Sequence, residues 1–135
     1  MLELVAAYVP AIWCLLAMGG LLLIQLLVAD VVGLSSGHTP GSTVVSNHDN
    51  FHFRTVRAHA NTNESVAALL LLVVACIALG ASPQWVNWLS IAYCLGRVSH
   101  MLCYWFNWSI PRSLSFVVSL AALFGLFALG TAAAI

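Results

Sequence analysis

The sequence has very little charge for its length. Only 6% of its 135 residues are charged, as four arginines and four acidic residues, and lysine is absent. A soluble domain carries about 25% charged residues, so this chain cannot cover a globular surface with solvated groups. Its formal net charge of zero also gives no sign of nucleic-acid binding. The low charge therefore excludes an ordinary soluble domain.

Paired cysteine motifs are also missing. The four cysteines lie inside apolar segments without CxxC spacing, so we expect them to be buried, reduced packing residues. Three histidines lie in or beside a polar loop, but their spacing is uneven and no cysteine accompanies them, so we predict no metal site. These residues are Cys14, Cys76, Cys94 and Cys103, and His38, His48 and His52.

Apolar residues, in contrast, are abundant. They make up 62% of the chain, and the mean hydropathy is +1.01. Four apolar blocks, at about 5–34, 51–80, 83–108 and 111–134, are each long enough to cross a bilayer. Lipid admits only helices and closed barrels, and these blocks are too long and uniform for barrel strands. The sequence therefore predicts an all-α, multi-pass membrane protein, with a four-transmembrane-helix bundle as a single domain over residues 1–135.

The basic residues predict its orientation. Arg54 and Arg57 open the second block and Arg112 opens the fourth, at the same side of the membrane. The other turn and both ends of the chain carry no basic side chain. By the positive-inside rule, the first and third connections face the cytoplasm and both termini lie on the opposite side.

Two polar stripes run along the second and third blocks. The residues of each stripe are three or four positions apart, so each stripe occupies one helix face. A count of depth at about 1.5 Å per residue places the two stripes at the same level, as the walls of a cleft that opens to the cytoplasm. The first stripe is Arg54, Arg57, Asn61 and Glu64, and the second is Arg97, His100 and Tyr104.

Two charges in these stripes lie deep in the membrane. An isolated charge near the bilayer centre costs about 2.5–3.5 kcal/mol, and the depth count brings Glu64 level with Arg97. We therefore predict an ion pair between Glu64 and Arg97, within one subunit or across an interface. A structural salt bridge alone would explain this pair but not the other polar residues on the same faces.

The start of the fourth block points to an anion. A cation at a helix N-terminus opposes the helix dipole, whereas an anion bound by Arg112 would be favoured by both the dipole and the guanidinium. Ser113 offers a hydroxyl beside it. The predicted ligand is a small, multiply charged cytoplasmic anion, with an apolar partner that approaches from the lipid. Its donors would be Arg57, Asn61, His100, Tyr104, Arg112 and Ser113.

Two separated motifs resemble those of the MAPEG family, the membrane-associated proteins of eicosanoid and glutathione metabolism. The run "RTVRAHANTNES" is similar to the family signature at Arg57, Asn61 and Glu64. The segment "GRVSHMLCYWFNWSIPRSLSF" is similar to the part that links its third and fourth helices. The resemblance covers nearly the whole chain, and the microsomal glutathione transferases are the members that it most suggests.

The resemblance implies a homotrimer with glutathione as co-substrate at each subunit interface. Glutathione would be held by Arg57, Asn61, Glu64, His100, Tyr104 and Ser113, and Arg112 is similar to the catalytic arginine that stabilises the thiolate. The implied function is that of a glutathione-dependent transferase or peroxidase that acts on apolar electrophiles or lipid hydroperoxides. Ala60 and Phe116 depart from residues of the eicosanoid-synthesising members, which weakens that more specific assignment.

Two other classes of function remain open. Buried ionisable residues also mark transport paths, although the chain shows no inverted repeat or broken helix. A structural membrane protein with a relic anion-binding cleft would carry the same residues. The sequence leaves open the second substrate and the choice between transferase, peroxidase and isomerase.

Overall fold

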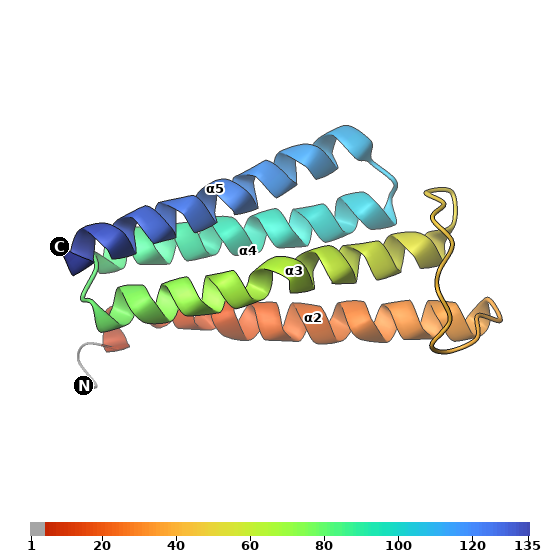
Figure 1. Cartoon of the computed structure of the whole chain (residues 1–135), viewed down its shortest axis with the longest axis horizontal. Coiled ribbons are helices and arrows are strands. Elements are labelled where there is room, and N and C mark those ends of the chain that lie inside the picture. The colour runs from red at the N-terminus through yellow and green to blue at the C-terminus, as the bar shows by residue number, and fades with distance from the viewer. Residues whose placement is uncertain (1–4) are drawn as a thin grey trace.

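The computed structural model of the protein describes residues 5–135, and they form a bundle of four long helices (Figure 1). The two connections α2–α3 and α4–α5 lie at one end of the bundle, and the α3–α4 turn lies at the other end with the C-terminus (Figure 1). The end with two connections is called the loop end below. The helices are α2 (Val9–Ser35), α3 (Phe51–Ala78), α4 (Pro83–Trp105) and α5 (Ser109–Ala134).

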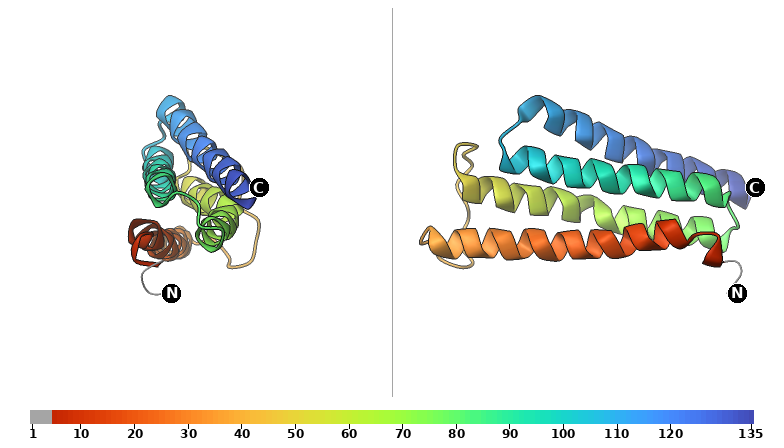
Figure 2. Two further views of the ribbon diagram at one scale, coloured as in Figure 1. Left: turned by 90° about the vertical axis from the view of Figure 1, so that its left-hand side faces the viewer. Right: turned by 180° about the vertical axis from the view of Figure 1, so that it is seen from behind.

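The helices have the dimensions of a membrane bundle. α2, α3 and α5 contain 27, 28 and 26 residues and are long and apolar enough to cross a membrane. α4 is more polar, but its 23 residues extend for about 34 Å. It runs alongside its neighbours over the same thickness in both side views (Figures 1 and 2). The predicted all-α membrane fold of four helices is therefore confirmed.

A backbone reversal fixes where α4 ends. Asn107 has a positive φ of 59°, and the amide of Trp108 donates to the carbonyl of Cys103 at 2.8 Å. This is the Schellman arrangement, in which a residue in the left-handed region turns the chain away from the helix axis. α4 consequently ends at Trp105 rather than at the expected Trp108. Gly80, with a φ of 68°, ends α3 in the same way.

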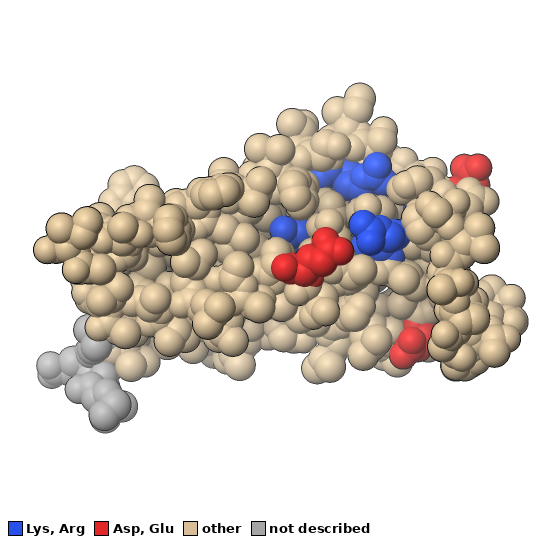
Figure 3. Space-filling model, in the orientation of Figure 1, with Lys and Arg blue, Asp and Glu red and all other residues tan. Residues whose placement is uncertain are grey.

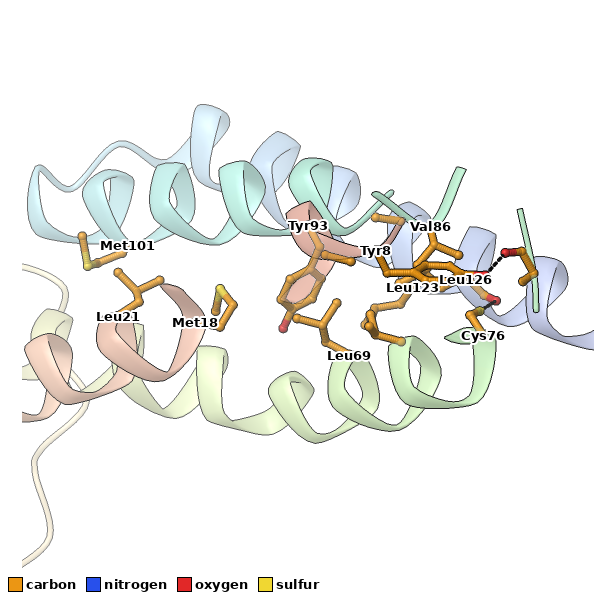
Figure 4. Close-up of a cluster of buried hydrophobic side chains, with 14 of the residues drawn as sticks. Tyr8, Met18, Leu21, Leu69, Cys76, Val86, Tyr93, Met101, Leu123 and Leu126 are labelled. Atoms are coloured by element: carbon orange, nitrogen blue, oxygen red, sulfur yellow. Dashed lines mark hydrogen bonds between the residues drawn. The ribbon is translucent and has the colours of Figure 1, made fainter. Parts of the chain in front are cut away.

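The apolar core follows the axis of the bundle. Its side chains come from all four helices and are closed off from lipid and solvent (Figure 4). At the end opposite the loops, Asn87 accepts from the amide of Ala11 at 3.1 Å and donates to the carbonyl of Ala7 at 2.9 Å. These bonds fix the start of α2 against α4. Core members include Met18, Leu21, Leu69, Val73, Val86, Tyr93, Leu123 and Leu126.

α5 does not pack evenly along its length. Its buried residues begin at Ser119, and none of the residues from Ser109 to Val118 is fully buried. The first half of α5 diverges from α3 at the loop end, whereas its second half returns to the bundle (Figures 1 and 2). The polar faces of α3 and α4 are left partly uncovered at this end.

Candidate functional site

A buried arginine joins α4 to α3 at the centre of the candidate site. Arg97 is 1% exposed, and its Nη1 donates to the side-chain oxygen of Asn61 at 2.6 Å and to the carbonyl oxygen of Asn61 at 3.4 Å. The guanidinium carbon also lies 5.3 Å and 5.5 Å from the ring centroids of Tyr93 and Phe116. One amide and two aromatic faces therefore hold this charge inside the bundle.

The expected ion pair between Glu64 and Arg97 is not formed within the chain. Among the residues that the structure describes, Glu64 pairs with Arg57 instead, at 3.9 Å between Oε1 and Nη1. Helical side chains lean toward the helix N-terminus, which directs Glu64 back along α3 toward Arg57. Asn61 occupies the position beside Arg97, one turn away from the register that the depth count predicts. An ion pair of Glu64 with Arg97 across a subunit interface stays a prediction.

A second arginine lies against an aromatic ring near the loop end. The guanidinium carbon of Arg112, at the start of α5, is 4.6 Å from the ring centroid of Tyr104 on α4. His100, one turn before Tyr104, packs edge-on against the same ring at 5.1 Å and lies 6.1 Å from the ring of Phe116. The structure thus brings His100, Tyr104 and Arg112 together, as the sequence predicts. A cation on a ring face gains about 0.5–2 kcal/mol.

Sequence reasoning missed His48 as part of this group. Nδ1 of His48, in the α2–α3 loop, lies 3.5 Å from Nη1 of Arg112. Its ring also stacks on Tyr104 at 6.3 Å with an interplanar angle of 18°. No sequence signal predicts this contact, because the loop has no periodicity.

Ser113 is not directed into the group. Its hydroxyl donates to the carbonyl of Ser109 at 3.3 Å, a bond within the first turns of α5, and the residue is exposed. The side chains of Arg57 and Glu64 on α3 also point outward, and they are 41% and 60% exposed. Both remain accessible to a ligand or to a second subunit.

The charged residues gather on one face of the bundle. Arginine side chains surround an acidic side chain near the middle of this face and toward the loop end (Figure 3). Two further acidic side chains are visible on this face near the loop end, and the rest of the coloured surface in this view shows no Lys, Arg, Asp or Glu side chain (Figure 3). Because the chain contains only four basic residues, this cluster is its main positively charged surface. The polar cluster, as named here, consists of Arg57, Asn61, Glu64, Arg97, His100, Tyr104 and Arg112.

Two cavities lie outside the polar cluster. One of about 410 Å³ lies between the end of α2, the α2–α3 loop and the start of α3, and its walls include Asp30, His38 and His52. The other, of about 340 Å³, is a wholly apolar hollow between Leu72 on α3 and Phe124 on α5. Within the polar cluster itself, Arg97, His100 and Tyr104 are buried, whereas the side chains of Arg57 and Glu64 are exposed.

The sequence model of the MAPEG family matches residues 10–132, which is nearly the whole chain. The match covers all four helices except the first residue of α2 and the last two residues of α5, and it includes every member of the polar cluster. No curated protein matches the sequence at a significant level.

Proposed function

This chain belongs to the MAPEG family, and we propose that it is an integral-membrane glutathione-dependent transferase or peroxidase. Membership makes it a membrane protein of glutathione and eicosanoid metabolism. The activity within that class, and the likeness to microsomal glutathione transferases, are our proposal. The observation that carries it is the convergence of Arg112, Tyr104 and His100 beside an uncovered, positively charged surface.

The positive charges match the chemistry of glutathione. Glutathione carries two carboxylates and one ammonium group at neutral pH, with a thiol near its centre. Arg57 is exposed and can bind a carboxylate through two parallel hydrogen bonds, while Glu64 beside it can accept from the ammonium group. Within the described residues 5–135, Arg97 bonds to the amide of Asn61 and has no carboxylate partner. It therefore adds to the positive potential that favours an anion.

Arg112 is the proposed catalytic residue. A free thiol has a pKa of about 8.5, and a neighbouring guanidinium lowers it. The thiolate is the nucleophile, so stabilising it raises the reactive fraction at neutral pH. Tyr104 supports this role because its ring fixes the plane of the Arg112 guanidinium.

The proposed activity has two forms, a conjugation and a peroxide reduction. In the transferase, the thiolate sulfur forms a bond to an electrophilic carbon, and the leaving group departs with its electron pair. In the peroxidase, two glutathione molecules are oxidised to the disulfide, while a lipid hydroperoxide is reduced to the alcohol and water. The apolar substrate would enter from the bilayer, because the outer faces of the helices expose large apolar side chains to it.

The assembly and orientation belong to the same proposal. A homotrimer would place a second subunit over the exposed Arg57 and Glu64, and the site would then lie between subunits. The loop end, which carries the basic residues of α3 and α5, would face the cytoplasm by the positive-inside rule. Both ends of the chain would lie on the opposite side.

Turnover by the purified protein tests the proposal. We expect conjugation of glutathione to a reactive aryl halide, or reduction of a lipid hydroperoxide, in detergent or nanodiscs. Arg112→Ala should lower kcat by about a hundredfold to a thousandfold, the range for loss of one group that stabilises an oxyanion. Arg112→Lys keeps the charge but loses the planar stack, so it should retain part of the rate.

Binding separates the alternatives. Calorimetry should show that glutathione binds the wild type and that Arg57→Ala weakens this binding. Binding without any turnover would favour a non-catalytic binding or transport protein. Neither binding nor turnover would contradict the proposed function and leave a structural role.

A further inference from the structure

The α2–α3 loop is attached to the polar cluster at two points. At the main chain, Nη1 of Arg54 donates to the carbonyl of His48 at 2.6 Å. At the side chain, the His48 ring meets Arg112 and Tyr104. A loop that only linked two helices would need neither contact, because the chain leaving α2 is already turned by its own backbone bonds.

The hydrogen-bond chemistry assigns a direction to the side-chain contact. Arginine has donors and no acceptor, so Nδ1 of His48 must accept from Nη1 of Arg112, and the ring proton then sits on Nε2. At 3.5 Å this bond is long, but the stacked Tyr104 ring supports it. The Arg112 guanidinium is thus restrained by Tyr104 on its face and by His48 at one edge.

Arg54, in the first turn of α3, fixes the main chain at His48 through this hydrogen bond. Besides the bond to His48, its Nη2 donates to the carbonyl of Trp105 at 3.5 Å, at the end of α4. Its guanidinium carbon lies 5.4 Å from the ring centroid of Phe51. One side chain of α3 therefore ties the loop to the helix that carries Tyr104.

We propose that His48 is a positioning residue that holds Arg112 in the orientation in which it stabilises the glutathione thiolate, with Arg54 as its anchor. This inference rests on the proposed function for its substrate. His48 acts through Arg112 and does not itself exchange a proton with glutathione. In the proposed function Arg57 binds a carboxylate of glutathione, so loss of His48 should affect the thiolate more than the affinity for glutathione.

Three variants of His48 separate its two contacts. His48→Ala removes both the acceptor and the ring, His48→Phe keeps only the ring, and His48→Asn places an oxygen acceptor close to the position of Nδ1. His48→Ala should lower kcat by about threefold to tenfold, as for loss of one hydrogen bond, with KM for glutathione changed by less than about twofold. The ultraviolet absorbance of the bound thiolate should titrate at higher pH in this variant.

Rescue and a matched control make this test decisive. His48→Asn should restore most of kcat and of the thiolate absorbance, whereas His48→Phe should restore less. His38→Ala is the control, because His38 lies in the same loop but packs against His52, at 4.7 Å between ring centroids, and hydrogen-bonds to Ser42. It should behave as the wild type. Equal kcat and equal thiolate titration in wild type and His48→Ala would overturn the proposal.

Amide hydrogen exchange supplies a readout that does not need glutathione. In the intact protein in nanodiscs, residues 44–50 should exchange faster in His48→Ala, in Arg112→Ala and in Arg54→Gln than in the wild type. If the wild type neither binds nor turns over glutathione, the proposed function fails. Faster exchange in all three variants would then still support the attachment of the loop to Arg112. Unchanged exchange in His48→Ala and Arg112→Ala would overturn it.

Discussion

Arg97 on α4 and Asn61 on α3 share a hydrogen bond of 2.6 Å, and the guanidinium that makes it is 1% exposed. The partner of this buried charge is a neutral amide rather than a carboxylate. An amide can satisfy a donor without cancelling its charge, so the site keeps the positive potential that an ion pair would remove. In a medium of low dielectric constant that potential acts strongly on an incoming anion.

We expect Asn61→Ala to destabilise the bundle. The change leaves the Arg97 guanidinium without its closest acceptor, and loss of a hydrogen bond to a charged group costs about 1.5–3 kcal/mol. The thermal unfolding midpoint in detergent, followed by circular dichroism, should fall. Asn63→Ala is the matched control, because Asn63 is exposed on the same helix, and its midpoint should stay near that of the wild type.

Asn61→Asp separates stability from ligand binding. The carboxylate would keep the hydrogen bond to Arg97 but neutralise its charge. We expect a midpoint close to that of the wild type, together with weaker binding of glutathione by calorimetry. Equal or tighter binding would contradict the view that the uncompensated charge of Arg97 attracts the anion.

Glu64→Gln should have little effect on the fold of one subunit. The Arg57–Glu64 pair is 3.9 Å long with both side chains well exposed, and exposed pairs contribute about 0–1 kcal/mol. The unfolding midpoint should therefore barely change.

Native mass spectrometry of the same variant tests the interface. Loss of the oligomer with an unchanged midpoint for the subunit would show that Glu64 pairs across subunits.

Gly96→Ala should disturb the contact of α4 with α5. A Cβ at Gly96 would lie 2.3 Å from Oγ of Ser119 and 3.0 Å from the carbonyl oxygen of Ser115. The hydroxyl can rotate away, but the backbone of α5 cannot, so the helix must shift at a cost of about 1–3 kcal/mol. We expect a lower unfolding midpoint and reduced kcat, since α5 carries Arg112.

Gly19→Ala is the control for that substitution. Apart from the neighbouring backbone of α2, no atom of the described residues lies within 4 Å of a Cβ built at Gly19, and alanine is favoured over glycine in a helix by about 1 kcal/mol. Its midpoint should rise or stay unchanged. A similar fall in both variants would contradict the view that the close approach of α5 at Gly96 governs the effect.

The sequence predicted the helices well because their signals are local. Block length and hydropathy identified four helices, three of which are apolar enough to cross a membrane. The spacing of Arg97, His100 and Tyr104 correctly placed these side chains on one face of α4. The depth count was less reliable. It assumed straight helices with level ends, and it brought Glu64 rather than Asn61 to Arg97. An error of one turn is enough to exchange the partners of a buried charge.

Contacts that depend on a loop could not be predicted. His48 contacts Arg112 from a loop whose main chain is hydrogen-bonded to Arg54, and no periodicity in the loop predicts that contact. Ser113 is a second example, and its contact with a ligand stays a prediction. Its place in the sequence beside Arg112 suggested a ligand contact, whereas its hydroxyl bonds to the preceding turn of its own helix. Neighbours in sequence on a helix point in different directions.

The ring of Tyr104, rather than its hydroxyl, should carry most of its contribution to catalysis. The ring face lies 4.6 Å from the Arg112 guanidinium carbon and its edge meets His100. Tyr104→Phe keeps these contacts, so we expect kcat to stay within about threefold of the wild-type value.

Tyr104→Leu is similar in polarity to Phe but has no ring face. The loss of about 0.5–2 kcal/mol of cation–π attraction should release Arg112. Its kcat should fall further than that of Tyr104→Phe, and its bound thiolate should titrate at higher pH. Steady-state kinetics and thiolate absorbance measure both effects. If Tyr104→Phe instead fell as far as Tyr104→Leu, the hydroxyl would be the active group, as a direct hydrogen-bond donor to glutathione.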